Sequence, residues 1–522
     1  MSNTFQNIRG LRPGRSVFNL SYEKKMTCDM GQLIPIMCDE VVPGDKFTIG
    51  NQVVVRFQPL VAPVMHEINC YVHYFFVPYR ILWDQWDDFI TGGPNGTLTP
   101  VIPTWTPTPS TGNVKGTLWD FLGFPTGISP TGRFPLDFPR RAYNRIYNEF
   151  YRDETLITEV AETNETILNR CWEKDYFTSS LPWQQRGTAP SLPISGTSHA
   201  IWSGDQTLSN LNAYIQRNGT ERLFGATASD GTDVLTMKTT NSSSGALTNQ
   251  PVYTKPTLPA SALNNNIVDL SSATTFNVSD LRLIFQIQKW LERNARGGAR
   301  YTEFLRSHFG VSPRDDRLQR PEYMGGSKCP VIFSEVLKTA TTDATSPQGN
   351  MAGHGIAVDT SYCAKYFAQE YGLIMGVMSI MPRSAYQQGI DRQWLRQTKY
   401  DFYFPEFANL SEQAIERVEL YASAIESENK TLFGFQGRYD EMRVKRNMVV
   451  SEMRDTFNYW HLGRVFSSAP LLNQSFVECT PATLKRIFAV QNVPGLIVTC
   501  GNLIKAVRPL PVQSEPGLID HN

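Results

Sequence analysis

The sequence predicts a mainly β protein, an antiparallel sandwich of about eight strands with large loop insertions and a few helices. Apolar and polar residues alternate with a period of two through much of the segment 46–76. Short apolar runs return after residue 330 and are separated by long loops. Strands and helices do not alternate regularly along the chain, as a parallel sheet would require. These observations together favour an antiparallel fold.

The composition is that of a folded protein with no net charge. The chain has 522 residues, of which 41% are hydrophobic and 11% aromatic, so it can bury a large core. Lys and Arg together number 49, as do Asp and Glu, and the net charge is zero. Because proteins that bind nucleic acid over a broad surface are usually basic, any such contact must come from a local patch. Zero net charge also favours association.

The sequence gives no support for a membrane-spanning protein, a secreted protein or a protein with a cysteine metal site. No stretch approaches the roughly 18–20 apolar residues of a membrane span, and the start MSNTFQNIRGLRPGRS has no apolar core, so we expect no signal peptide. The eight cysteines form no CxxC pair, which predicts free thiols in a reducing compartment. We therefore expect no metal site and no cofactor.

Residues 1–25 are predicted to form a basic N-terminal arm. Arg9, Arg12 and Arg15 lie among glycines and a proline, and Glu23 is the one acidic residue of the segment. Glycine and proline favour an extended chain over a helix. The arm is either a solvated tail or a segment that contacts phosphate or a neighbouring subunit.

Strands are predicted in 26–80. Val53, Val55 and Phe57 recur with a period of two before Pro59 ends the run. In the next strand one face carries Val64, Ile68, Cys70, Val72, Tyr74 and Phe76, and the other face carries Glu67, Asn69 and His73. This pattern predicts a half-buried antiparallel strand.

The segment YRILWDQWDDFITGG (79–93) is predicted to be one short helix that ends at two glycines. Leucine, isoleucine and aromatic residues form one apolar arc, which would make Trp83 and Trp86 packing anchors. Asp84 and Asp88 lie on the opposite side, with Asp87 at the edge of the arc. Acidic residues near the C-terminal end of a helix are electrostatically unfavourable, so an arginine partner is expected. Three carboxylates on one helix do not give the opposed pair that a glycosidase needs.

The rest of the chain is predicted in three parts. Residues 94–185 are rich in Pro, Trp and Tyr and complete the first part of the sandwich (26–185) as long packed loops. Residues 186–275 are crowded with Ser, Thr, Asn and Gly and are predicted to be a surface insertion. Residues 276–522 hold a helix that packs on the core, with Ser279 as its N-cap, the remaining strands and a tail. Strands are expected at 329–337, 372–381, 485–491 and 495–507.

No residue can be nominated as catalytic. The chain lacks a P-loop, a dinucleotide-binding glycine motif, a zinc protease motif and a nucleophile elbow. The seven histidines are dispersed, and no Ser/His/Asp or Cys/His set follows from the order of the residues. We therefore predict that the protein is not an enzyme.

Several stretches resemble one family. YFFVPYRILWDQWDDFITGG (74–93) is similar to a signature of the major capsid protein of gokushoviruses, small single-stranded DNA phages of the Microviridae. Five further stretches match in the same order: 285–311, 317–326, 402–410, 433–443 and 511–521. The resemblance covers nearly the whole chain and is weakest over 186–275. Met324 stands where the family would have leucine, a mild change.

The resemblance implies an eight-stranded viral jelly roll whose copies form a T=1 icosahedral shell around circular single-stranded DNA. Shell formation implies contacts of the chain with itself, including pentameric contacts. An internal scaffolding protein, a pilot protein and a small basic DNA-binding protein are the implied partners. The protein would be part of the virion and would assemble in the cytoplasm of a bacterial host. The large insertion would build a protrusion at the three-fold axes.

Three residue-level hypotheses follow. Asp84, Asp87 and Asp88 are expected at a subunit interface, where Asp84 or Asp88 would face an arginine of a neighbour. Arg9, Arg12 and Arg15 are expected to contact the packaged DNA through phosphates. The insertion is expected to meet a receptor on the host cell surface. The alternative function is a carbohydrate-binding jelly-roll protein that does not form shells.

Overall fold

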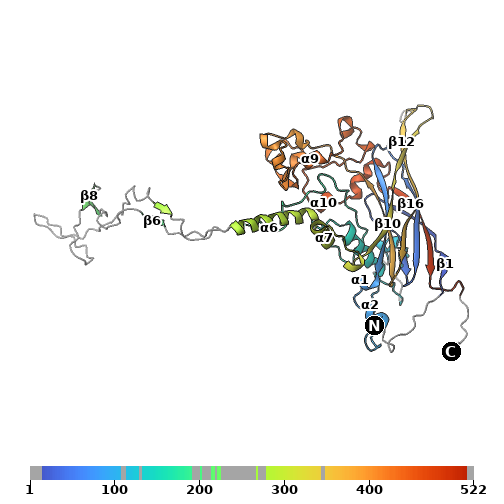
Figure 1. Cartoon of the computed structure of the whole chain (residues 1–522). Coiled ribbons are helices and arrows are strands. Elements are labelled where there is room, and N and C mark those ends of the chain that lie inside the picture. Colours follow the sequence, from blue (N-terminus) through green and yellow to red (C-terminus); the bar gives the residue numbers. More distant parts are fainter. Residues whose placement is uncertain are drawn as a thin grey trace, which may run out of the picture. The chain divides into compact units, whose positions relative to one another are not determined.

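The computed structural model describes residues 14–106, 113–128, 132–190, 278–342 and 347–513, and the backbone of four short strands within 200–268. The chain divides into two units. The main unit comprises 1–188 and 290–522, and the second unit comprises 189–289. Figure 1 shows the course of the chain. Arg9 and Arg12 lie outside the described residues.

The main unit contains a six-stranded antiparallel sheet at the right of Figure 1. Its strands are β1 (Ser16–Asn19), β2 (Tyr22–Cys28), β4 (Lys46–Phe57), β11 (Ile332–Leu337), β12 (Met351–Phe367) and β16 (Leu496–Arg508). The order across the sheet is β1, β16, β4, β12, β11, and β2 also pairs with β16. The first and last strands of the main unit therefore lie side by side.

A four-stranded antiparallel sheet packs against one face of the first. Its strands are β3 (Ile34–Val41), β5 (Ile68–Pro78), β10 (Glu322–Pro330) and β13 (Gly372–Pro382), in the order β10, β5, β13, β3. Alternate residues of both sheets form the core between them, because successive side chains of a strand point to opposite faces. Val53 and Val55 of β4 and Tyr74 and Phe76 of β5 belong to this core, as their alternation predicted.

The other face of the four-stranded sheet is also covered, so β5 is not half-buried as predicted. Phe75 and Val77 pack into a second core beneath the helix α4 (Phe138–Ile146) and the π-helical turn η1 (Tyr147–Tyr151). Within β5, His73 alone keeps partial exposure. The sequence did not reveal this layer, because 94–185 was predicted to be loops. Asn144 and Asn148 bind backbone carbonyls of 160–164 and hold the neighbouring loop in place.

Two long connections carry the remaining elements of the main unit. The helices are α1 (Tyr79–Leu82), α2 (Trp86–Thr91), α3 (Leu118–Phe121), α7 (Tyr301–Phe309), α8 (Glu426–Asn429), α9 (Asp440–Arg443) and α10 (Gln474–Val477), and β14 (Glu412–Glu416) pairs with β15 (Leu432–Gly437). The 3-10 turns are η4 (Asp316–Leu318), η5 (Arg392–Trp394), η6 (Lys399–Asp401), η7 (Pro405–Phe407), η8 (Arg417–Glu419), η9 (Ser451–Arg454), η10 (Asn458–Trp460) and η11 (Pro481–Ile487). No described helix is long and apolar enough to cross a membrane.

The second unit contains two short antiparallel pairs. Strand β6 (Ala200–Trp202) pairs with β9 (Asn266–Val268), and β7 (Ala213–Arg217) pairs with β8 (Thr220–Phe224). Helix α6 (Val278–Gly297) begins in this unit.

Three further predictions need correction. Residues 16–28 form β1 and β2, so the described part of the predicted arm is mostly strand. Residues 481–487 form the 3-10 turn η11, and 485–491 is not a strand. Helix α6 begins before Ser279. Of its predicted apolar face, Phe285 is 64% exposed and the other four residues are half-buried: Leu281, Ile284, Gln288 and Leu291. Within 279–297 only Asn294 and Ala295 are buried, so the prediction that this helix packs on the core is wrong for most of the helix.

Candidate assembly surfaces

The segment 79–93 forms two helices instead of one. Trp83 is extended, with φ −155° and ψ 113°, and separates α1 from α2. Gly92 ends α2 in a left-handed conformation with φ 77°, and its N–H donates to the carbonyl of Asp88. The break changes the direction of the chain, so the single apolar arc that the sequence predicted does not form. Phe89 and Ile90 are exposed.

Both tryptophans nevertheless lie against the second core. The ring of Trp86 is 4.9 Å from that of Tyr79 and 6.0 Å from that of Phe138. The ring of Trp83 is 6.5 Å from that of Phe138. Phe138 is fully buried and stacks on Tyr79 at 4.5 Å. The first residue of α4 is thus the common contact of α1, α2 and the segment between them.

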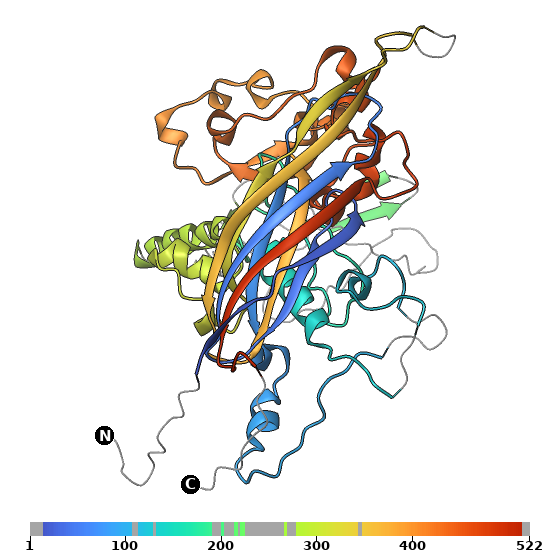
Figure 2. The ribbon, with the colours of Figure 1, turned by 90° about the vertical axis from the view of Figure 1, so that its right-hand side faces the viewer.

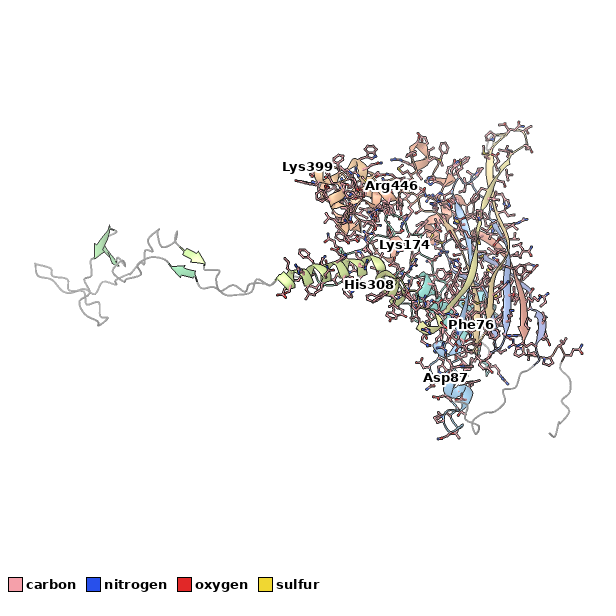
Figure 3. The ribbon with its side chains drawn as sticks, in the orientation of Figure 1. Phe76, Asp87, Lys174, His308, Lys399 and Arg446 are labelled. Carbon is pink, nitrogen blue, oxygen red and sulfur yellow. The ribbon has the colours of Figure 1, made fainter. Side chains whose placement is uncertain are left out.

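Asp84, Asp87 and Asp88 are exposed, and no described cation lies within ion-pair distance of them. Asp87 and Asp88 lie in the first turn of α2, because the helix begins at Trp86. A carboxylate there is favourable, so the expectation that these residues lie unfavourably near a helix C-terminus is wrong, and the helix dipole gives no reason for an arginine partner. Figure 3 shows Asp87 at one end of the main unit, far from Lys399.

Arg15 is the described member of the three arm arginines. It is exposed, and its guanidinium lies 5.6 Å from the centre of the Phe367 ring at the end of β12. Phe367 pairs with Lys46 of β4. The arm therefore enters the structure at a basic corner of the six-stranded sheet.

Exposed aromatic residues gather on the connection between β13 and β16. This aromatic surface consists of Trp394, Tyr400, Phe402, Tyr403, Phe404 and Leu410, which are between 42% and 75% exposed. A monomeric protein rarely exposes a large continuous apolar patch. Interfaces between proteins are enriched in aromatic residues and arginine, and Arg396 and Arg438 lie over rings of this segment.

The backbone beneath the aromatic surface is held in place by local hydrogen bonds. The Asp401 carboxylate accepts from the N–H groups of Gln397 and Thr398 and from the Thr398 hydroxyl. These hydrogen bonds lower the pKa of Asp401 because they stabilise its charged form. Tyr403 packs on Tyr439 with ring centres 5.0 Å apart. A surface held in this way loses little conformational freedom when it binds a partner.

A cavity of about 710 Å³ lies on the outer side of the four-stranded sheet. It is lined by aromatic and charged side chains, including His73, Tyr151, Arg170, Glu173 and Tyr323. Its carboxylates are engaged: Asp153 pairs with Lys174, Asp315 pairs with Arg320, and Glu173 accepts from the Tyr71 hydroxyl.

The histidine of this cavity is a weak base. Burial, and then the charge of Arg170, lower the pKa of His73 to about 4. Its Nδ1 lies 2.6 Å from the Tyr151 hydroxyl. A general base works best with a pKa near the operating pH. Among the described residues, no three His, Cys, Asp or Glu side chains are placed to hold a metal ion.

The comparison with protein families decides the identity. The model of the family described as "Capsid protein (F protein)" matches residues 6–518. The chain belongs to the phage capsid F protein family. It is therefore the structural capsid protein of a small single-stranded DNA phage of the Microviridae, located in the virion, and not an enzyme.

The chain aligns with its relatives over nearly their full length. The capsid protein is 32% identical to capsid protein VP1 of Chlamydia phage 1, over 99% of this chain and 98% of the relative. It is 33% identical to capsid protein VP1 of Bdellovibrio phage phiMH2K, over 98% and 97%. The VP1 of Spiroplasma virus 4 is 29% identical over similar shares. The family assignment from the sequence is confirmed, and the carbohydrate-binding alternative loses its support.

The sequence reasoning missed the aromatic surface as a unit. Four of its six residues fall within the matched stretch 402–410, yet the aromatic side chains follow no helical or strand period. Three 3-10 turns interrupt the segment, and such turns leave no regular signal. The available signal was composition: six aromatic residues lie within 394–407 of a chain that is 11% aromatic.

Proposed function

We propose that copies of the capsid protein assemble into a T=1 icosahedral shell, with pentameric contacts, around circular single-stranded DNA. The observation that carries the proposal is the exposed aromatic surface on a rigid segment of a chain from a capsid family. Obligate interfaces bury about 2,000–5,000 Å² and use aromatic residues as anchors. Sedimentation of the co-expressed chain should show one large, uniform species, and only small oligomers would contradict the proposal.

The two sheets are proposed to form a jelly roll. The support is the strand order. Of the eight strands β2, β3, β4, β5, β10, β12, β13 and β16, the first, eighth, third and sixth are neighbours in one sheet. The fifth, fourth, seventh and second are neighbours in the other. This order is that of two Greek keys folded into a double sheet.

Asp84 and Asp88 are proposed to face an arginine of a neighbouring subunit, with Asp87 beside them. Asp88→Arg should lower the yield of shells several-fold, because like charges would meet at the interface. The free energy of unfolding of the subunit should stay within about 0.5 kcal/mol of the wild-type value, since Asp88 is exposed. Shell yield from native gels and electron microscopy measures the effect. Asp88→Glu, which keeps the charge, is the control, and normal shells from Asp88→Arg would refute the contact.

Arg9, Arg12 and Arg15 are proposed to contact the packaged genome. Replacing all three with alanine should reduce the DNA content of purified particles, because phosphate contacts supply affinity without sequence information. The ratio of absorbance at 260 and 280 nm, with quantitative PCR, measures that content. Lysine at the same three positions keeps the charge and should restore packaging. If the alanine variant packages normally, the arm only ties neighbouring subunits together.

Residues 186–275 are proposed to form the protrusion at the three-fold axes and to meet a host receptor. The division of the chain supports a separate unit there, since 189–289 cluster apart from the rest. Deleting the segment should leave a subunit that folds and assembles but particles that no longer attach to cells. If the deletion abolishes soluble protein, the segment belongs to the core.

The remaining partners are proposed from the family alone. They are an internal scaffolding protein, a pilot protein and a small DNA-binding protein of the virion. Omitting the scaffolding frame from co-expression should remove closed shells while leaving soluble subunits.

A further inference from the structure

Among the described residues of the main unit, no layer covers one face of the six-stranded sheet. Figure 2 looks onto this face, and no helix lies in front of the central strands β4, β12 and β16. The four-stranded sheet and the described helices of the main unit lie on other sides. The uncovered side chains are alternate residues whose neighbours along each strand belong to the buried core.

This face concentrates positive charge. It carries the exposed side chains of Lys25, Lys46, Arg56, Lys365 and Lys505. On β2, β4, β12 and β16 the only carboxylate that points the same way is Glu23, which is 3.7 Å from Lys25 on the edge strand. Asp359 of β12 points inward and lines a small space between the sheets. The chain as a whole has no net charge, so the surplus here is local.

Three of the lysines form one cluster. Thr48 of β4 pairs with Lys365 on one side and with Lys505 on the other, and Lys46 lies two residues along the same strand. Neighbouring strands are about 4.8 Å apart, so the backbones of Lys365 and Lys505 are about 10 Å apart. Among the described residues, no carboxylate pairs with any of the three. Arg15 approaches the same corner over Phe367.

Two exposed aromatic side chains lie on the same face as the lysines. Tyr362 is 70% exposed and Phe367 is 48% exposed. Tyr362 pairs with Gly50 of β4, and a Cβ at Gly50 would meet the tyrosine ring at 2.9 Å. The ring therefore lies across the glycine, with one side open to solvent. Glycine inside a strand often marks such a close approach.

We propose that this basic sheet face binds the packaged single-stranded DNA, with the lysines on phosphates and the exposed rings stacked on bases. Single-stranded nucleic acid is bound without sequence preference by a basic surface that also offers aromatic rings. The charge of the face fits an extended polyanion. This inference rests on the proposed function, because it makes the face the inner lining of the shell.

The test uses the soluble full-length chain and a fluorescently labelled oligothymidylate. The variant is Lys46→Gln with Lys365→Gln and Lys505→Gln, and binding is followed by anisotropy over a range of salt concentrations. Each phosphate contact contributes about 0.7 to the slope of log affinity against log salt for single strands. The triple variant should therefore lower the magnitude of the slope by about 2.

The matched control removes three exposed lysines elsewhere: Lys115, Lys399 and Lys445. Its slope should equal that of the wild type. Tyr362→Ala should lower affinity about tenfold with the slope unchanged, because stacking carries no charge. An unchanged slope in the triple variant, or equal losses in variant and control, would overturn the proposal. So would loss of binding to vesicles of anionic lipid without loss of binding to the oligonucleotide.

Particles separate this inference from the proposed function. Shells of the triple variant should form and contain less DNA than wild-type shells. If wild-type chains make no shells, the proposed function fails whatever the slope. If shells of the triple variant carry a full genome, the inference about this face fails and the capsid function stands.

Discussion

Replacing Phe138 with alanine should destabilise the subunit by about 3–5 kcal/mol, the usual cost of removing a fully buried phenylalanine. The cavity left by the substitution cannot close easily, because Phe138 contacts three aromatic residues from other segments: Tyr79, Trp83 and Trp86. The variant should loosen α1 and α2 as well as α4. Urea unfolding followed by tryptophan fluorescence measures the change, since both tryptophans report on this contact.

The control for that experiment is Phe309→Ala at the end of α7, where the phenylalanine is 69% exposed. It makes the same deletion without a cavity and should cost less than about 0.5 kcal/mol. Equal midpoints for Phe138→Ala and the wild type would show that the second core does not hold α1 and α2. Trp83 and Trp86 would then lose their proposed role as anchors.

Replacing Trp394 with alanine should weaken assembly strongly while leaving the fold intact. Trp394 is 75% exposed, so the free subunit loses little packing. Tryptophan is enriched among residues whose truncation costs about 2 kcal/mol or more at interfaces. That cost corresponds to roughly a 30-fold loss of pairwise affinity. Because a shell repeats each contact many times, closed particles should nearly disappear at moderate protein concentrations.

Tyr362→Ala is the matched control for Trp394→Ala, since Tyr362 is 70% exposed but lies on the basic sheet face. It should lower DNA binding and leave shell yield unchanged. Light scattering against protein concentration gives the critical concentration for assembly of each variant. If Trp394→Ala assembles like the wild type, the aromatic surface is not a subunit contact.

The strands were predictable because their alternation is local. Phe47, Ile49, Val53 and Val55 of β4 face the core, and alternate residues such as Gln52 and Arg56 face solvent. The register of β4 between β12 and β16 was not predictable, because those strands are hundreds of residues away in the sequence. The basic sheet face depends on that register, so it could not be predicted from the sequence.

The second core shows a different limit. The run Phe138, Ala142, Tyr143 and Ile146 has helical spacing, and Asp137 precedes it, so α4 was within reach of the sequence. That α4 covers β5 was not, because β5 alternates like a half-exposed strand. The break at Trp83 had no sequence signal either, since no proline or glycine lies between Tyr79 and Thr91.

The most direct test is single-particle cryo-electron microscopy of particles purified from cells that express the chain with its neighbouring reading frames. We expect closed, uniform T=1 shells with the basic sheet face of β4, β12 and β16 turned toward the DNA. The aromatic surface around Trp394 should lie between subunits. Small soluble oligomers, or shells with the basic sheet face on the outside, would contradict this account.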